Sequence, residues 1–255
     1  MRRCLRLTVC LALFVAVSRT FAAGDVEFDH VWIVVTRDAP ERAAVERSGF
    51  RISPTVNRND GQGTASISVE FLNAYIELMW PDPTVPVAPG AERGAEKFKQ
   101  RMNWRTSGWC PIGIGLHRTG GGNAALPFPT WSIAPEWMPA GTAIEILTPR
   151  DDTKSPSLFI EPPVLAVSEE ANRKLPATDP KRAAFQHPIG VERLTEIRII
   201  RPKAYQAIAA FAYLEKAGVV KAEEGSEWAV NVTFDHGRKA QTKDLRPALP
   251  LIIRY

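Results

Sequence analysis

Two side chains that can bind a metal ion or exchange a proton stand out because most of their neighbours in the sequence are apolar. His30 lies in the run FDHVWIVV, and Glu77 lies in the run NAYIELMW. On a buried face, an imidazole or a carboxylate is unfavourable unless it is paired or bound to a metal. The two residues therefore predict a functional site, with a metal ion as the first candidate ligand.

The segments that would position this pair read as strand, helix and three further strands in residues 24–82. The short helix begins at Asp38-Ala-Pro40 and ends before Gly49, which is a standard start and stop pattern. Residues 64–72 alternate apolar and polar side chains, which is typical of a strand with one face in water. We expect the strands of this first βαβββ unit at residues 26–36, 50–53, 64–72 and 75–80.

A third unit, residues 191–255, shows the same order of elements. Its helix, residues 203–217, carries apolar residues at three-residue spacing and ends at Gly218. Its strands are expected at residues 193–201, 227–234 and 249–255.

The second unit, residues 110–163, is degenerate, because a glycine-rich stretch at residues 120–123 and a loop rich in proline and tryptophan replace its helix. Two connectors separate the units: residues 83–109, which include a linker helix, and residues 164–190. Their proline content makes both poor sheet segments. The second unit is expected to form strands at residues 111–118, 142–147 and 157–161.

Residues 1–23 read as a secretory signal peptide. Three arginines precede an uncharged apolar run at residues 7–17, and small residues at positions 20, 22 and 23 offer a cleavage site. The run is shorter than the roughly 20 residues that span a bilayer, which argues against a retained anchor. We therefore expect a periplasmic or secreted protein with no membrane contact after cleavage.

Removal of this segment changes the charge balance. It holds four of the 32 basic residues and none of the 28 acidic residues, so the remaining chain has equal numbers of both. The basic pI thus comes from the signal, and we expect no nucleic-acid partner. Two of the three cysteines also lie in the signal. The remaining thiol, Cys110, is expected to be buried.

Repeated βαβββ units with a histidine on the first strand and a glutamate on the fourth resemble the vicinal oxygen chelate superfamily, which includes glyoxalase I, extradiol dioxygenases and bleomycin-resistance proteins. The chain is similar to bacterial glyoxalase-like domain proteins over nearly all of residues 24–255. The motifs that carry this similarity are DHVWIVV, GTASISVEF, NAYIELMW, CPIGIGL, FPTW, QHPIG, RLTEIRI and DLRPALPL. The resemblance implies an α+β fold in which the units form a cupped mixed sheet. It also implies a divalent metal, held by the first and last strands of each unit, that acts as a Lewis acid on two neighbouring substrate oxygens.

The resemblance assigns three metal-ligand positions. His30 and Glu77 match the first-strand and fourth-strand ligands of the first unit. Glu161 matches the fourth-strand ligand of the second unit, because the IE of SLFIEPP aligns with the IE of NAYIELMW. One imidazole and two carboxylates suit a divalent ion that keeps open positions for water or substrate. Glu161 is either the third ligand or the general base of the reaction.

The remaining ligand positions are not filled. The first-strand position of the second unit falls near Ile112, and alternation puts His117 on the opposite face of that strand from Ile112. The third unit offers Glu196 on its first strand but Ile253 on its last. A structural alternative also stands, in which His30 is a hydrogen-bonded core residue and Glu77 pairs with an arginine. The candidate arginines are Arg58 and Arg105.

Tryptophans gather in the connections that would line the mouth of the cup, as suits a ligand with an apolar or ring-bearing body. The residues expected to contact the substrate are Trp80, Arg105, Trp109 and Trp131. The alternative is that these tryptophans fill contacts beneath long loops. His187 and His236 are predicted to be turn residues rather than ligands, because glycine or proline follows each of them closely.

The sequence thus predicts an exported, metal-dependent lyase, isomerase or dioxygenase that acts on a small oxygenated compound. A competing hypothesis is a non-catalytic protein that sequesters a small ligand in the same cup, and a third is a structural remnant without a ligand. The odd number of units leaves two arrangements open. Either the first two units pair and the third packs outside, or a homodimer supplies the missing partner.

Overall fold

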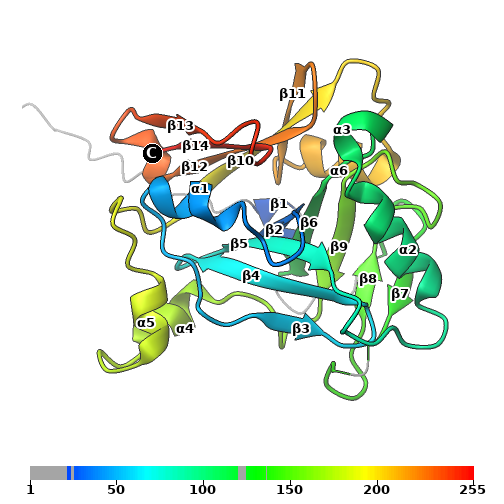
Figure 1. Cartoon of the computed structure of the whole chain (residues 1–255), viewed down its shortest axis with the longest axis horizontal. Coiled ribbons are helices and arrows are strands. Elements are labelled where there is room, and N and C mark those ends of the chain that lie inside the picture. Colours follow the sequence, from blue (N-terminus) through cyan, green and yellow to red (C-terminus); the bar gives the residue numbers. More distant parts are fainter. Residues whose placement is uncertain (1–21, 24–25, 120–124, 136) are drawn as a thin grey trace, which may run out of the picture.

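The protein folds as a mixed α+β structure with two curled β-sheets packed face to face (Figure 1). This computed structural model describes residues 22–23, 26–119, 125–135 and 137–255. Nearly all of the expected signal segment lies outside the described residues. Its last two residues form β1 (Ala22–Ala23), which pairs with the start of the next strand. No helix in the described part of the chain has the length and apolar character to cross a membrane.

Within the described residues, the large sheet has nine strands. Eight of them follow the order β3-β4-β5-β2-β6-β9-β8-β7, and β1 pairs with β2 outside this path. At its centre β2 and β6 run antiparallel, β5 is parallel to β2, and β9 is parallel to β6. The strands are β2 (Val26–Val34), β3 (Asn57–Asn59), β4 (Thr64–Glu70), β5 (Tyr75–Pro81), β6 (Ile112–Arg118), β7 (Trp131–Ile133), β8 (Ile144–Ile146) and β9 (Ser157–Glu161).

The second sheet has the order β11-β10-β12-β14-β13. Its closing strand β14 pairs in parallel with β12, whereas the closing strand of the first block, β5, pairs with the opening strand β2. The third block therefore differs from the first block in two ways: it has an additional strand, β13, and it has another strand order. The strands are β10 (Leu194–Pro202), β11 (Lys221–Gly225), β12 (Ala229–Phe234), β13 (Thr242–Asp244) and β14 (Leu251–Arg254).

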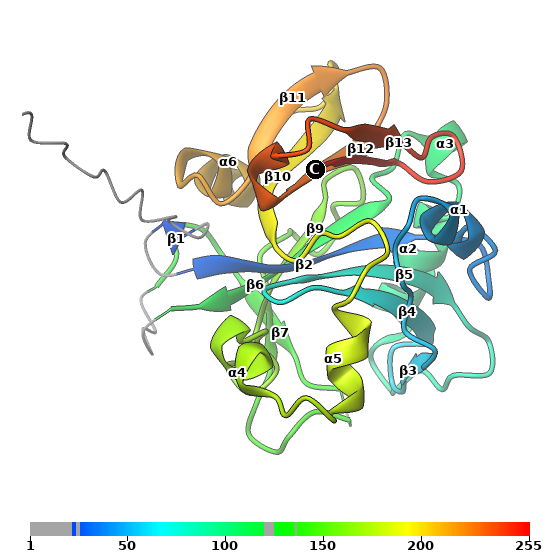
Figure 2. The same cartoon turned by 90° about the vertical axis from the view of Figure 1, so that its left-hand side faces the viewer.

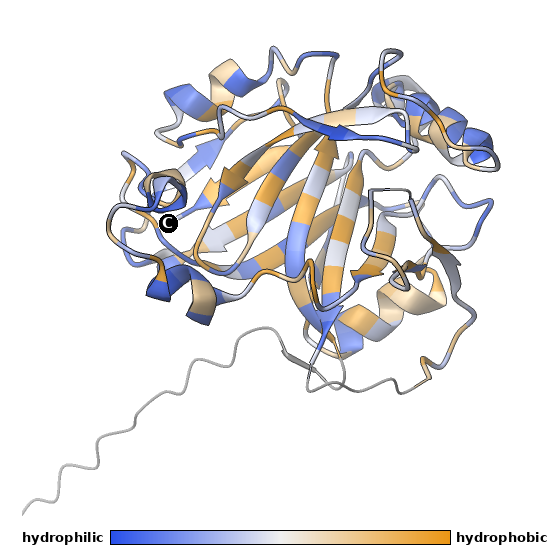
Figure 3. Ribbon diagram, turned by 90° about the horizontal axis from the view of Figure 1, so that it is seen from below, coloured by the Kyte–Doolittle hydropathy of each residue, from blue (hydrophilic) through white to orange (hydrophobic). Residues whose placement is uncertain are grey.

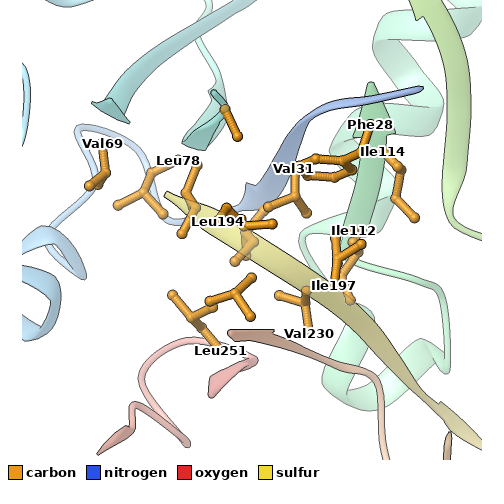
Figure 4. Packing of buried hydrophobic residues seen from close by; sticks show 14 of the residues in the cluster. Phe28, Val31, Val69, Leu78, Ile112, Ile114, Leu194, Ile197, Val230 and Leu251 are labelled. Atoms are coloured by element: carbon orange, nitrogen blue, oxygen red, sulfur yellow. The ribbon is translucent and has the colours of Figure 1, made fainter. Parts of the chain in front are cut away.

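The main hydrophobic core lies between the two sheets (Figure 4). Val31 and Ile114 of the large sheet face Ile197 and Val230 of the second sheet in a cluster of fully buried side chains. The helices α1 and α6 add apolar side chains to the same cluster. Burial of each such aliphatic side chain contributes about 1.5–3 kcal/mol, so this interface is the main source of stability.

The helices are short and lie around the sheets. Two of them begin with side-chain caps: Ser168 accepts a hydrogen bond from the N–H of Ala171, and Asp179 accepts one from the N–H of Lys181. In two perpendicular views, α4 and α5 lie on the side of the large sheet away from the second sheet (Figure 2). The helices are α1 (Arg42–Arg47), α2 (Glu92–Arg101), α3 (Trp104–Ser107), α4 (Glu169–Lys174), α5 (Pro180–Ala184) and α6 (Ala209–Lys216).

Several expected elements begin or end elsewhere. Residues 50–53 do not form a strand, and the second strand of the first block is Asn57–Asn59. Pro54 has no N–H to donate to a ladder, which ends pairing at that point. The helix expected at residues 203–217 starts only at Ala209, after a turn that follows Pro202. In the second block, β7 lies within the stretch expected to be a loop, and the glycine-rich residues 120–123 lie outside the described residues.

The two histidines predicted to be turn residues differ in their surroundings. His187 is buried: its Nδ1 accepts a hydrogen bond from the N–H of Arg51 at 3.0 Å, and its Nε2 lies 2.8 Å from the carbonyl oxygen of Glu70. It thereby joins the second connector to the large sheet. His236 is exposed in the short 3₁₀ turn Asp235–Gly237, between β12 and β13.

Candidate functional site

The three predicted ligands lie on one face of the large sheet, which we call the His30 face. His30 is next to Tyr75 on β5 and opposite Gly115 on β6, and Trp32 is next to Glu77. Side chains alternate between the two faces of a sheet, so His30 and Glu77 project to the same side. Figure 3 views the molecule from below and shows this alternation as bands of hydrophobic and hydrophilic residues along the strands.

His117 and Glu161 share this face, because they are register partners on β6 and β9, and His117 lies two residues beyond Gly115. The prediction that His117 is on the opposite strand face from Ile112 is confirmed. However, it is Ile112 that points away from the site, into the core between the sheets. The sequence reading therefore excluded the wrong residue: His117 belongs to the His30 face.

A β-bulge at Asp29 brings a further acid to the site. In the ladder between β2 and β6, Phe28 pairs with Leu116 and His30 pairs with Gly115, so Asp29 has no partner on β6. Bulges redirect side chains next to the extra residue. The carboxylate of Asp29 can therefore reach the His30 ring, although the two residues are adjacent in the chain.

Asp29 is fully buried and accepts three hydrogen bonds. Its Oδ1 lies 2.8 Å from Nδ1 of His30, and its Oδ2 lies 3.2 Å from Nδ1 of His117 and 2.7 Å from the backbone nitrogen of Val167. On the outer side of this chain of contacts, Nε2 of His117 is 3.4 Å from Oε2 of Glu27. Asp29 thus holds two imidazoles, and both can donate their Nδ1–H to it.

The network favours an ionised Asp29 and raises the pKa of both histidine rings. Burial raises the pKa of Asp29, but the hydrogen bonds from His117 and His30 outweigh burial and hold that pKa far below its usual range. For His30, burial lowers the pKa, and the hydrogen bond and charge of Asp29 raise it above 6.5 overall. The same balance, again with Asp29 as the main partner, raises the pKa of His117.

The His30 ring is fixed on all sides. It stacks on Tyr75, with ring centroids 4.2 Å apart, and meets Phe159 edge-on at 5.3 Å. It also lies over Gly115, where an added Cβ atom would be 2.2 Å from Cε1 of His30. With Nδ1 directed to Asp29, Nε2 remains available, and no described group forms a hydrogen bond with it. Histidines that bind metals are commonly held through the other ring nitrogen in this way.

Glu77 and Glu161 are buried carboxylates, each 8% exposed. Burial raises the pKa of both, and it raises the pKa of Glu161 to about 7, although the charge of His30 opposes the shift. Oε2 of Glu161 is buried without a hydrogen-bond partner among the described residues. The two acids therefore favour the neutral form unless a cation is brought to them.

The structural alternative of an arginine partner for Glu77 is wrong. Arg58 donates to the hydroxyl and carbonyl oxygens of Thr84, and Arg105 donates to the carbonyl oxygens of Pro247 and Ala248. Within the part of the chain that the structure describes, Glu77 and Glu161 form no ion pair with lysine or arginine. The cationic group whose charge acts on both acids is His30.

The buried charge of Glu161 leads to a stability prediction. Its pKa is raised from 4.5 to about 7, so its contribution to stability is fully present below pH 4.5 and is lost as the pH rises through 7. At about 1.4 kcal/mol per pKa unit, Glu161→Gln should stabilise the metal-free protein by about 3 kcal/mol at pH 8. At pH 5 the variant and the wild type should differ little. Urea denaturation at both pH values measures the effect.

The exposed Glu170→Gln serves as the control for this comparison, because Glu170 pairs with Lys174 on the surface of α4. It should change stability by less than about 0.5 kcal/mol at either pH. A Glu161→Gln protein that is less stable than the wild type at pH 8 would contradict the conclusion that burial disfavours the ionised form of Glu161.

The donors on the His30 face match a divalent cation in type but are not drawn together around one point. An oriented imidazole, two carboxylates and an orphaned buried oxygen suit such an ion. Among residues 22–23, 26–119, 125–135 and 137–255, however, no group of three or more His, Cys, Asp or Glu side chains is placed to hold one. Side-chain rotations would have to bring His30, Glu77 and Glu161 together.

The residues predicted to contact substrate are dispersed. Trp80 is 2% exposed and points from the other face of β5 into the core between the sheets, so its expected role at the cup mouth is wrong. Arg105 lies beside a small cavity near β2 and stacks over Trp104. Trp109 is half-buried just before β6. Trp131 lines a different cavity, described below.

Three residues of the site were missed from the sequence. Asp29 was missed because strict alternation places it opposite His30, and only the bulge reverses this. His117 was set aside because the ligand position of its strand was placed near Ile112, whereas Gly115 is the residue opposite His30. Tyr75 was missed because it read as one more aromatic strand residue, although it stacks on His30. The adjacent pair Asp29-His30 was the available signal, since a histidine ligand needs a carboxylate or carbonyl for its second nitrogen.

Comparisons with known proteins add little. No family model matches the sequence, and no curated protein matches it. Among solved structures, a similar chain is the crystal structure of a hypothetical protein from Staphylococcus aureus, with 12% sequence identity and a TM-score of 0.48 over 90% of this chain and 98% of that chain. This likeness is too distant to indicate a function.

Proposed function

We propose that the chain is an exported glyoxalase-like protein of the vicinal oxygen chelate type, and that its His30 face binds a small oxygenated compound together with a divalent cation. The proposal rests on one observation: an imidazole oriented by Asp29 shares a sheet face with two buried carboxylates that form no ion pair with lysine or arginine among the described residues. A divalent cation would offset the charge that burial disfavours in Glu77 and Glu161.

The strand order of the large sheet supports a pairing of the first two units. In the first unit, the last strand β5 lies beside the first strand β2 and parallel to it. In the second unit, the last strand β9 lies beside the first strand β6 and is also parallel to it. The two units therefore follow each other across the sheet in opposite order. In such a pair, Glu77 and Glu161 hold matching positions, as do His30 and Gly115. The fourth ligand position would then be a glycine, which leaves coordination sites open for substrate oxygens.

The residues of the face have distinct roles in this proposal. Asp29 fixes the tautomer of His30, so that Nε2 presents a lone pair to the site. A bound cation would supply Lewis-acid polarisation of the substrate oxygens. The Glu161 carboxyl, with a pKa of about 7, is suited to taking up and returning a proton near neutral pH. Lyase, isomerase or dioxygenase chemistry would use these groups.

Metal analysis of the purified protein tests the proposal. We expect the wild type, stripped with chelator and titrated with Mn²⁺, Zn²⁺ or Ni²⁺ by calorimetry, to bind one of these ions at about one per chain. His30→Ala should abolish this binding, and Glu161→Gln should weaken it about 10–100-fold. The exposed His236→Asn is the matched control and should bind as the wild type does. Equal binding by the wild type and His30→Ala would refute His30 as a ligand.

A second candidate is a non-catalytic protein that sequesters a small ligand. The observation that favours it is the aromatic lining of the same face, where Trp32, Tyr75 and Phe159 surround His30, and Phe98 of α2 packs on Trp32 at 5.4 Å. Aromatic walls hold a ring-bearing ligand without a metal. This candidate predicts that no divalent ion binds and that His30→Ala leaves metal content unchanged.

A further inference from the structure

A cavity of about 390 Å³ lies where the loop before β7 and the loop after β8 meet the start of α6. None of the predicted metal ligands lines it. Its volume is in the range of small-molecule sites, and its walls are mainly apolar, as is usual for such sites. The lining residues are Phe128, Pro129, Thr130, Trp131, Leu147, Pro149, Arg150, Ile208, Ala209 and Ala210.

The aromatic walls of this cavity are held in place before any ligand arrives. The indole Nε1 of Trp131 donates a hydrogen bond to the carbonyl oxygen of Thr148 at 2.9 Å. Phe128 meets Tyr213 of α6 edge-on, with ring centroids 5.6 Å apart. Leu147 belongs to the main core. A ligand would therefore meet a formed wall, which lowers the entropy lost on binding.

The charge at the cavity has one sign. Arg150 is the only ionisable side chain in the lining, and its guanidinium lies 4.1 Å from the centre of the Trp131 ring. In the described part of the chain, Arg150 forms no ion pair with a carboxylate. The first turn of α6, which also lines the cavity, contains no acidic residue, and its N-cap Ile208 supplies no side-chain acceptor. Both features favour an anionic group.

We propose that this cavity binds a small organic anion with a flat apolar body, of the class of aromatic carboxylates. The ring of the ligand packs among Phe128, Trp131 and Ile208, and the carboxylate faces the guanidinium of Arg150. The planar donors of a guanidinium match a carboxylate in two parallel hydrogen bonds. None of the candidate metal ligands lines this site, so it requires neither the histidines of the His30 face nor a metal ion.

Calorimetric titration of the full chain with 1-naphthoate, and with the uncharged 1-naphthamide, tests this proposal. We expect the wild type to bind naphthoate, and Arg150→Gln to weaken that binding about tenfold while leaving naphthamide binding unchanged. The matched control is Arg42→Gln on α1, an exposed arginine that pairs with Glu46. It should bind both compounds as the wild type does.

Two further variants keep the test independent of folding defects and of the proposed function. Ala209→Asp places a carboxylate at the cavity where an acid favours the start of a helix, so it should fold, reject naphthoate and retain naphthamide. His30→Ala should bind naphthoate normally, whatever its effect on metal binding. Absence of naphthoate binding up to millimolar concentration, or equal weakening by Arg150→Gln and Arg42→Gln, would overturn the proposal.

Discussion

Replacement of Asp29 by alanine is expected to destabilise the protein by about 3–5 kcal/mol at pH 7, because it removes the acceptor of three buried hydrogen bonds. His30 and His117 would lose the charge that holds their rings, and the N–H of Val167 would lose its partner. Because the pKa of Asp29 is lowered in the folded state, its contribution is present above pH 3.8 and is lost as the pH falls through the folded pKa. Urea denaturation at pH 7 and at about pH 2 measures both parts.

Glu27→Gln is the control for this variant, because Glu27 contacts the outer nitrogen of His117 and is partly exposed. It should change stability by less than about 1 kcal/mol. If Asp29→Ala were no more destabilising than Glu27→Gln, the buried network would not contribute as the geometry indicates.

Substitution of Gly115 by alanine is expected to destabilise the protein by about 2–3 kcal/mol, because the new methyl group would overlap the His30 ring. The ring cannot move without losing its stacking on Tyr75 or its hydrogen bond to Asp29. The same displacement should weaken the proposed metal binding, which distinguishes this variant from one with a simple packing defect. Denaturation and metal titration of the same preparation measure both effects.

Gly94→Ala is the control for Gly115→Ala, and we expect it to stabilise the protein. Gly94 lies inside α2 with open space where a Cβ atom would be added, and alanine is the better helix former. We expect this variant to be about 0.5–1 kcal/mol more stable than the wild type, with unchanged metal binding. A Gly115→Ala protein as stable as Gly94→Ala would show that the His30 ring is not fixed as described.

Local sequence patterns were sufficient for the strands that carry the predicted ligands. The alternating run of β4 and the apolar runs of β2 and β5 lie close to the expected residues, because each has a clear period and a turn at its end. The expectation that Ser66 and Ser68 face water is wrong, since both are buried. Periodicity identifies two faces of a strand, but it does not tell whether other segments cover the second one.

Local sequence patterns could not predict features that depend on contacts between segments far apart in the chain. The place of β14 beside β12, and not beside β10, follows from long-range packing of the second sheet on the first. The contact of Val167 with Asp29 joins a connector to a strand 138 residues earlier in the chain. Trp80 points into the core because it lies two residues after Leu78 and therefore on the same face of β5. The alternation of β5 would have shown this, but the large aromatic side chain suggested a binding role.

Asp29, the extra residue of the bulge in β2, suggests a route by which this site arose. Val26 and Phe28 before the bulge, and Val31 and Ile33 after it, all lie in the core between the sheets, while His30 lies on the other face. If Asp29 is left out, the remaining residues of the strand alternate without interruption, and Phe28 and His30 oppose consecutive residues of β6. The sheet is therefore complete without this position. An acid that holds two histidines could have entered the protein as a single-residue insertion, with every neighbouring side chain kept on its original side.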